Sequence, residues 1–362
     1  MLRQLDVLAR HGDVTTLSYG ERPDAAHDHL QIDSALPSLP QTVSGVLKLA
    51  LRRYRSVALD APAVRAAREA LGAREFDIVV ANEARALPLA RAVAGSPRIW
   101  CDLHEWAPAE RSHVLSWRLL VAPFMDWVCR TYLPGVDAAT TVNQSIATMY
   151  EEHFGARTEV VRNAMAYCPD LAPSPLASDR IRLVHSGGAV AGRNIEAIIE
   201  AVDLLGDRYS LDLYLIQPRQ ADGYWRKLAD RIAASAQTTL HPAVRPADLP
   251  QTLNAYDLGV FVLPPHTPNH RLMLPNKFFD FVQARLGIVF GPAVETDRLI
   301  RDHRLGVITE GYTAADLVRA IQGISREDVA RFKQSAHDVA ELLSSEADIA
   351  VQDAILTRLV HA

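Results

Sequence analysis

The chain has few cysteines, no surplus of positive charge and no long uncharged apolar run. Its three cysteines, Cys101, Cys129 and Cys168, are an odd number at wide spacing, which indicates neither a disulfide framework nor a zinc cluster and favours a reducing, cytoplasmic setting. Lys and Arg total 38 against 43 Asp and Glu, so the net charge is −5. Because there is no global positive field to hold a polyanion, we expect no nucleic-acid partner.

The sequence also has little that indicates a membrane or a secretory route. The first residues, MLRQLDVLARHG, alternate charge with leucine and do not resemble a secretory signal. The most membrane-like stretch, 114–133, contains Arg118, Asp126 and Arg130, so it is too charged to span a bilayer. We favour a helix packed on the core, and a peripheral membrane contact of this stretch is the alternative.

Apolar content with a regular rhythm is what the sequence does have. Of the residues, 49% are hydrophobic and 22% charged, so the chain should fold, and its length predicts two domains. Short apolar runs alternate with segments of helical period, which is typical of βαβ units. The predicted strands are 14–19, 76–81, 98–103, 138–142 and 159–161 in the first half and 181–186, 211–216, 238–240, 258–263 and 287–290 in the second.

This rhythm predicts an α/β fold of two Rossmann-like domains, whose parallel sheets flank a central cleft. The segment CPDLAPSPLASD has three prolines and little periodic apolar content, so it is the best linker. We therefore divide the chain into an N-terminal domain, a linker, a second α/β domain and C-terminal helices that pack across the domain junction. The boundaries are 1–167, 168–179, 180–328 and 329–362.

The segment LPNKFFDFVQA carries a candidate for anion binding. Pro275 suits the first position of a helix, which places Lys277 in the first turn, where free N–H groups bind phosphate. Asp280 lies three residues further on, on the same face. A cation for phosphate and a carboxylate for ribose hydroxyls fit a nucleotide diphosphate, whereas a solvated Lys–Asp pair on an amphipathic helix is the alternative.

A second candidate follows the predicted strand IRLVHS. Gly187 and Gly188 let the backbone approach a pyrophosphate closely, and Arg193 near the next helix adds a charge-assisted contact. This is the first strand-turn-helix of the second half, where open α/β sheets bind ligands. The pattern is neither GxGxxG nor a P-loop, so a plain turn is the other interpretation.

Together these elements resemble the donor-binding domain of family-4 glycosyltransferases, which adopt the GT-B fold. The resemblance is carried by RLVHSGGAVAGRNIEAIIEAVDLL, TTLHPAVRPADLPQTLNAYDLGVFVL and LPNKFFDFVQARLGIVF, and it covers nearly all of 180–325. It implies that Arg193 and Lys277 hold the donor diphosphate and that Asp280 bonds the ribose. The loop 241–245, with Val244, would line the nucleobase through its backbone.

Over 1–165 the resemblance is looser and rests on the segment CDLHEWAP. It is similar to the family's D-x-H-E loop, which implies that His104 contacts the donor sugar and supports departure of the diphosphate, with Asp102 and Glu105 on the sugar or acceptor side. These residues also follow a predicted strand, where α/β folds place chemistry. Without the resemblance, a histidine and acid that cap a loop would be the simpler interpretation.

Two departures from the family pattern limit what it implies. Leu272 stands where many members have a second carboxylate, so Asn269, His270 and Arg271 are the candidates to bond sugar hydroxyls. The expected first strand is missing, because LRQLDVLARHG reads as a helix. Since an absent central strand would expose sheet edges, we expect a misassigned start rather than a shortened sheet.

The resemblance implies a retaining glycosyltransferase that takes a UDP- or GDP-type sugar as donor, with no tightly bound cofactor. The acceptor would be a carbohydrate, a lipid-linked sugar or a small molecule. No D-x-D motif is evident, so we predict action without metal. A sugar-nucleotide epimerase of the same fold and a non-catalytic partner subunit are the alternatives, and the oligomeric state stays open.

Overall fold

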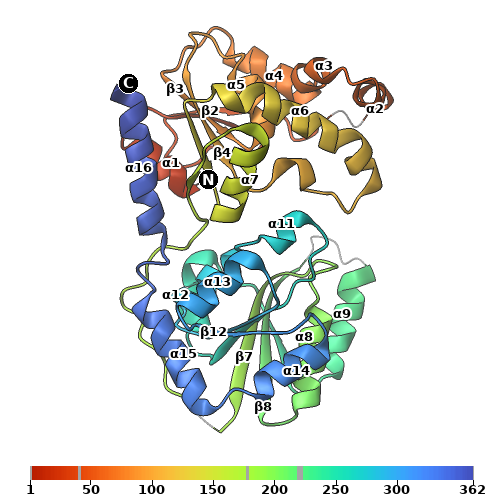
Figure 1. The fold of residues 1–362 in the computed structure, drawn as a ribbon, viewed down its shortest axis with the longest axis vertical. Coiled ribbons are helices and arrows are strands. Elements are labelled where there is room, and N and C mark those ends of the chain that lie inside the picture. The colour runs from red at the N-terminus through yellow and green to blue at the C-terminus, as the bar shows by residue number, and fades with distance from the viewer. Residues whose placement is uncertain (1, 40–41, 177–178, 218–222, 362) are drawn as a thin grey trace. The chain divides into compact units, whose positions relative to one another are not determined.

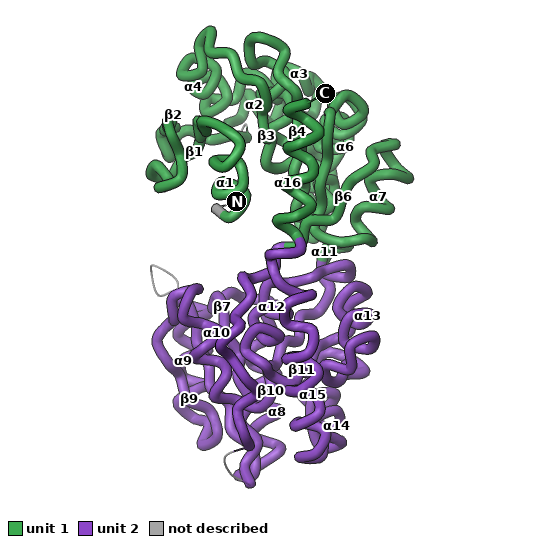
Figure 2. The backbone as a smooth tube through the Cα atoms, turned by 90° about the vertical axis from the view of Figure 1, so that its left-hand side faces the viewer, with its two compact units in different colours: residues 1–162, 266–269, 348–362 green, residues 163–265, 270–347 purple. Residues whose placement is uncertain are grey.

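The computed structural model describes residues 2–39, 42–176, 179–217 and 223–361 and divides into two compact units (Figures 1 and 2). Unit 1 comprises residues 1–162, 266–269 and 348–362, and unit 2 comprises 163–265 and 270–347. Of the predicted linker, residues 177 and 178 lie outside the described residues. No helix in the described ranges is long and apolar enough to cross a membrane.

Unit 1 is built on a parallel four-stranded sheet in the order β3-β4-β5-β6. Two further strands, β1 and β2, pair in parallel in a sheet of their own. The strands are β1 (Thr15–Ser18), β2 (Asp28–Gln31), β3 (Ile78–Asn82), β4 (Arg98–Leu103), β5 (Ala138–Thr141) and β6 (Glu159–Val160). The helices are α1 (Leu2–Ala9), α2 (Val43–Ala50), α3 (Tyr54–Leu59), α4 (Pro62–Leu71), α5 (Leu87–Ala90), α6 (Ala122–Tyr132), α7 (Gln144–Phe154) and the C-terminal α16 (Ser345–His361).

The two ends of the chain pack together on this sheet. Val7 of α1 and Leu356 of α16 share a buried cluster with Trp100 of β4 (Figure 1). The sequence predicts the helix before the first strand correctly, whereas β2 was not expected. The stretch 114–133 forms a π-helical segment, Trp117–Val121, followed by α6, which buries Phe124 and Val128 in the core as the favoured interpretation requires.

Unit 2 holds a parallel six-stranded sheet in the order β9-β8-β7-β10-β11-β12. Because β7 is the first of these strands in sequence, the order is that of a doubly wound dinucleotide-binding sheet, and it reverses between β7 and β10. The strands are β7 (Ile181–Gly188), β8 (Tyr209–Ile216), β9 (Thr238–His241), β10 (Leu258–Phe261), β11 (Gly287–Phe290) and β12 (Gly306–Ile308). The helices are α8 (Ile195–Leu205), α9 (Gly223–Ala234), α10 (Leu249–Leu253), α12 (Asn276–Gln283), α13 (Val294–Asp302), α14 (Ala314–Gln322) and α15 (Arg326–Asp338). The short helix α11 (Pro268–Arg271) contributes its first two residues to unit 1 and its last two to unit 2.

Helices cover both faces of the six-stranded sheet (Figure 1). On one face Leu183 and Leu211 pack with Ile199 of α8 and Leu317 of α14. On the other, Val184 and Phe261 pack with Phe278 of α12 and its neighbours. Two buried faces explain why these strands are almost continuously apolar, as the sequence predicts, and the α/β class with parallel sheets is confirmed. The last strand, β12, was not predicted.

A buried arginine ties the start of the predicted linker to unit 2. Arg285, which is completely buried, donates hydrogen bonds to the carbonyl oxygen of Cys168 (2.7 Å) and to that of Gln283 (2.8 Å). Gln283 in turn accepts from the amide of Cys168 (3.1 Å) and donates to the carbonyl of Ala340 (2.6 Å). Arg285 and Gln283 together therefore join three segments of unit 2 that are far apart in sequence.

We expect Arg285→Met to lower the free energy of unfolding by about 2–4 kcal/mol, because several buried carbonyl groups lose their donor. Arg331→Met is the matched control, since that side chain is 70% exposed and its change should cost about 0.5 kcal/mol or less. Urea denaturation monitored by circular dichroism measures both. Equal midpoints for the two variants would contradict the role given to Arg285.

Candidate functional site

The amine of Lys277 lies directly against Gly187, where the strand order of unit 2 reverses. A Cβ atom on Gly187 would come within 2.5 Å of Cε and 2.7 Å of Nζ of Lys277, and the residue has a φ of 140°. The backbone conformation favours glycine at this position, and a Cβ here would displace the end of the Lys277 side chain. Since β7 and β10 are neighbours, the loops that follow them meet at this edge of the sheet, which brings two motifs 90 residues apart in sequence into contact.

Positive charge gathers at this edge. Burial lowers the pKa of the Lys277 ammonium, the nearby Arg193 charge lowers it further, and Asp280 acts in the opposite direction. The sequence places Pro275 at the first helical position, but in the structure it is the N-cap of α12 and the helix begins at Asn276. Lys277 therefore still lies in the first turn of α12. Because the proline side chain has no acceptor, it leaves the first N–H groups of the helix without a side-chain cap.

The predicted glycine turn begins later than the sequence indicates. Strand β7 continues through Gly188, and Arg193 lies directly before the N-cap of α8, Asn194. Asn194 has a left-handed backbone, and its side chain donates a hydrogen bond to the carbonyl of Tyr312 (2.8 Å). Arg193 is exposed to solvent. Its charge adds to the lowering of the His185 pKa, after burial and the Lys277 charge.

His185, at the same edge, was assigned no role from the sequence. It is almost completely buried, and its Nδ1 donates to the carbonyl of Val260 at 2.9 Å. Burial, reinforced by the Lys277 charge, lowers its pKa to about 4. The imidazole is therefore neutral at pH 7 and adds no third positive charge.

The remaining predicted donor-site residues of unit 2 occupy neighbouring loops. Asp280 is buried one turn after Lys277 on α12. Val244 is half-buried in the loop after β9, whose last residue, His241, stacks on Tyr214 with ring centroids 4.7 Å apart. His270 is half-buried on α11.

In unit 1, Asp102 and His104 form one cluster at the carboxyl end of β4. The buried Asp102 carboxylate accepts from Thr140 Oγ1 (2.6 Å), Gln4 Nε2 (3.1 Å) and His104 Nε2 (3.1 Å). The hydrogen bond to Asp102 raises the pKa of His104, burial opposes this, and the charges of Asp102 and Glu83 add to the rise. Asp102 therefore holds the imidazole ring in place and favours its protonated form.

Glu83, which the sequence analysis missed, completes this cluster. Its Oε1 lies 3.7 Å from Nδ1 of His104, and its amide donates to the carbonyl of Asp102 (2.8 Å). Desolvation raises the pKa of Glu83 to about 7, and the His104 charge opposes the rise. Asp102 was chosen because α/β folds place chemistry where strands end. The same reasoning could have found Glu83, because it directly follows Asn82, the last residue of β3 and the register partner of Asp102 on β4.

The backbone of Glu83 is strained, with φ 74° and ψ 147°. This region of conformational space is almost confined to glycine. Strain of this kind is typical of functional sites.

Asn269 lies with the predicted His104 loop in unit 1 rather than with Lys277. Its side-chain oxygen accepts from the amide of Trp106 (2.9 Å), and its Nδ2 donates to Glu105 Oε2 (3.1 Å) and to the carbonyl of Trp106 (3.2 Å). Both ends of the amide thus fix the loop that carries Glu105.

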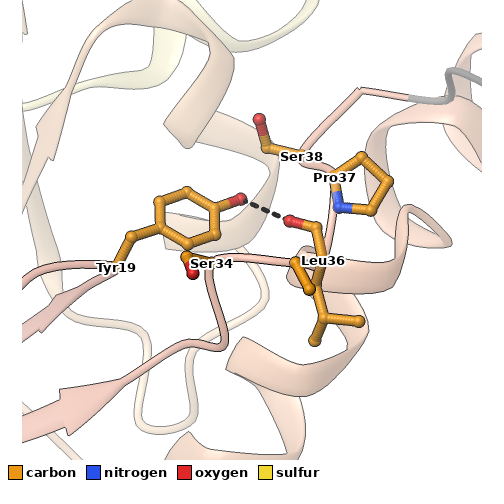
Figure 3. Close-up of a pocket in the computed structure, with 6 residues that line it drawn as sticks. Tyr19, Ser34, Leu36, Pro37 and Ser38 are labelled. Atoms are coloured by element: carbon orange, nitrogen blue, oxygen red, sulfur yellow. Dashed lines mark hydrogen bonds between the residues drawn. The ribbon is translucent and has the colours of Figure 1, made fainter. Parts of the chain in front are cut away.

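A separate small pocket in unit 1 is lined by Tyr19 and residues 34–38, and Tyr19 donates to the carbonyl of Leu36 at 3.1 Å (Figure 3). None of its lining side chains is charged, so it does not match a diphosphate. In the described ranges no group of three or more His, Cys, Asp or Glu could hold a metal ion.

Comparison with known proteins defines the fold class. Residues 3–165 match the sequence model of the family described as Glycosyltransferase Family 4. None of the curated proteins matches the sequence significantly. The family match falls on the half for which the motifs gave the looser resemblance.

Several solved glycosyltransferase structures share the fold. Sucrose-phosphate synthase from Thermosynechococcus elongatus has a TM-score of 0.68 at 15% identity, covering 99% of this chain and 92% of that one. Anabaena Alr3699/HepE in complex with UDP and glucose has a TM-score of 0.68 at 13% identity, covering 99% and 94%. For TarM from S. aureus the TM-score is 0.58 at 12% identity, covering 77% of this chain and 54% of TarM, so this chain spans about half the length of TarM. The fold is that of the GT-B glycosyltransferases, and the resemblance predicted from the sequence is confirmed.

We expect Glu83→Gly to raise the free energy of unfolding by about 1 kcal/mol, because glycine relieves the strained backbone. Glu83→Ala removes the same carboxylate but keeps a Cβ, so it serves as the control and should bring no such gain. Thermal denaturation of both variants measures the difference. If Glu83→Gly melts at or below the temperature of Glu83→Ala, the strain assigned to this residue is refuted.

Proposed function

We propose that the chain is a glycosyltransferase that moves a sugar from a UDP- or GDP-type nucleotide sugar to an acceptor hydroxyl, with retention and without metal. The observation that carries the proposal is the contact of Lys277 with Gly187 at the strand-order reversal, beside the charge of Arg193. A desolvated ammonium with a second cation nearby is poised for a ligand with at least two negative charges.

The donor diphosphate in this proposal occupies the edge formed by Gly187, Gly188 and the start of α12. Lys277, Arg193 and the first N–H groups of α12 neutralise the charge that develops as the sugar leaves. Asp280 bonds the ribose hydroxyls, and the backbone around Val244 lines the base. His270 remains the proposed hydroxyl contact in place of the carboxylate that Leu272 replaces. Asn269, whose amide is bonded at both ends to the loop of Glu105 and Trp106 in unit 1, is proposed to position that loop instead.

In unit 1 we assign His104 to the donor sugar, with Asp102 and Glu105 on the sugar or acceptor side. Asp102 orients the imidazole, as its 3.1 Å bond to Nε2 allows, and Glu83 faces the other ring nitrogen. Two carboxylates around one ring favour the imidazolium, which stabilises negative charge on the departing group.

The donor class is supported by what related structures contain. One Anabaena Alr3699/HepE structure is a complex with UDP-glucose, and one TarM structure is a complex with Fondaparinux, alpha-GlcNAc-glycerol and UDP. We therefore propose a nucleotide sugar as substrate and a carbohydrate, lipid-linked or small-molecule acceptor.

A sugar-nucleotide epimerase is the second candidate, and Glu83 is the observation that favours it. Epimerisation needs acid–base groups facing the sugar, and a carboxyl with a pKa of about 7 beside a histidine suits that task. Product analysis separates the two: an epimerised sugar with free nucleotide, and no product joined to any acceptor, identifies an epimerase.

We expect UDP-glucose or a GDP-sugar to raise the melting temperature of the wild-type protein and to leave that of Lys277→Ala unchanged. A ligand at 100 times its Kd stabilises the fold by about 2.7 kcal/mol. Lys227→Ala, an exposed lysine on α9 of the same unit, is the control and should retain the wild-type shift. A full shift in Lys277→Ala removes this lysine from the site, and no shift of the wild type with any nucleotide sugar refutes the proposed function.

The rate of transfer should depend on pH through Glu83. A carboxyl with a pKa of about 7 is protonated below that pH and ionised above it, so kcat should rise as pH increases through 7. Glu83→Gln cannot ionise and should lose this rise at unchanged nucleotide affinity. The measurement is kcat between pH 5.5 and 8.5, and an identical inflection in the variant would show that another group is responsible.

A further inference from the structure

The loop that carries Arg193 is shaped by two residues with a left-handed backbone. This loop joins β7 to α8, and the residues on either side of the arginine, Gly192 and Asn194, have φ angles of 85° and 60°. Glycine adopts this conformation without steric cost, and asparagine is one of the few other residues that tolerate it. The chain therefore bends both before and after Arg193.

Backbone hydrogen bonds hold the first part of the loop. The amide of Ala189 donates to the carbonyl of Ile216, the last residue of β8, at 3.0 Å. The amide of Arg193 donates to the carbonyl of Val190 at 3.2 Å, which closes a turn within the loop. These bonds use the backbone alone, so the exposed side chain of Arg193 is not part of them.

A side-chain hydrogen bond holds the other end of the loop. Asn194 Nδ2 donates to the carbonyl oxygen of Tyr312 at 2.8 Å, and the two residues are 118 positions apart. Asparagine at an N-cap usually accepts from the first amides of its own helix. Asn194 makes no such bond to α8. Its amide group therefore ties two loops together instead of capping the helix.

Tyr312, in the loop after β12, is itself held at the carboxyl end of the sheet. Its hydroxyl donates to the carbonyl of Pro292 at 2.7 Å. Its ring packs on Gly291, where a Cβ atom would come within 3.0 Å of Cδ1 of the tyrosine. Gly291 directly follows β11, and its amide donates to the carbonyl of Phe261, the last residue of β10, at 3.0 Å. Tyr312 thus links the loop of Arg193 to the ends of two central strands.

The helices that follow Asn194 and Tyr312 also fix the distance between them. Helices α8 and α14 lie side by side, and Ile199 and Leu317 share a buried cluster (Figure 1). Because the core already orders both helices, the hydrogen bond between the loops costs little additional conformational entropy.

We propose that Asn194 is a positioning residue of the donor site, whose bond to Tyr312 holds the turn that keeps Arg193 at the edge where Lys277 lies. A guanidinium on a loop that is already held in place loses less entropy when it binds a diphosphate than one on a free loop. Asn194 acts through the arginine and makes no contact with the nucleotide itself. The inference rests on the proposed function, because it assumes that Arg193 binds the donor diphosphate.

The test is a double-mutant cycle on the binding of UDP and GDP, measured by isothermal titration calorimetry. Asn194→Gly keeps the left-handed backbone without steric cost and removes the hydrogen bond. We expect it to raise the Kd about three- to tenfold for the nucleotide that the wild type binds. Arg193→Ala should raise the Kd about tenfold or more. In the Arg193→Ala background, Asn194→Gly should raise the Kd by less than about twofold, because the group that it positions is gone.

Arg304→Gly is the matched control. Arg304 is exposed and also has a left-handed backbone, with φ 53°, but it lies between α13 and β12, at the amino end of that strand. The change removes a positive charge and introduces glycine at a left-handed position, and it should leave the Kd at the wild-type value. Melting curves show that each variant is folded at the temperature of the titration.

The possible results separate this inference from the proposed function. If the wild type binds neither UDP nor GDP, the proposed function fails and the inference fails with it. If the wild type binds and Asn194→Gly leaves the Kd unchanged, only the inference is overturned. A purely structural Asn194 would lower the melting temperature without changing the Kd, or would raise the Kd by the same factor with and without Arg193. Either result also overturns the inference.

Discussion

The contact between the Lys277 ammonium and Gly187 is the constraint on which the candidate donor site depends. The contact exists because β7 and β10 are neighbours in the sheet, so that the loops that follow them meet. In sequence, β7 is the first strand of unit 2 and β10 is the fourth. A Cβ atom at Gly187 would displace the end of the Lys277 side chain from this position. The glycine, the strand order and the position of α12 therefore form one arrangement, and none of the three gives a cation at the sheet edge without the others.

Unit 1 shows a different solution for fixing a functional group. His104 follows the end of β4, and its two ring nitrogens face the carboxylates of Asp102 and Glu83. Asp102 is held in turn by hydrogen bonds from Gln4 and Thr140. This network gives the imidazole a defined ring orientation, and the strained backbone of Glu83 is its energetic cost. Unit 2 relies on backbone approach and helix ends, whereas unit 1 relies on a side-chain network.

The sequence predicted those parts of the structure that rest on local pattern. The nearly continuous apolar runs predicted the strands of unit 2, which are buried on both faces. The motifs around Gly187 and Lys277 predicted two residues that the structure brings together. β2 was missed because its sequence, DHLQ, holds a single apolar residue, and β12 was missed because it is only three residues long, GVI. Glu83 was missed because the features that mark it, a positive φ and its position beside the end of β4, are visible only in the structure. The bonding of Asn269 to Trp106 joins positions 163 residues apart, which no local pattern encodes.

The strand order of unit 2 also has a consequence for how the protein folds. β7 is made early in the sequence but sits in the middle of the finished sheet, and its neighbour β10 lies some seventy residues further along the chain. A chain that has formed only β7, β8 and β9 has a sheet with an open edge and no lysine beside Gly187. The ability to bind an anion at this edge is therefore acquired only after the long-range closure between β7 and β10, which is the slow kind of contact to form. Ligand binding during refolding would then report on the completion of the sheet, independently of how much helix has already formed.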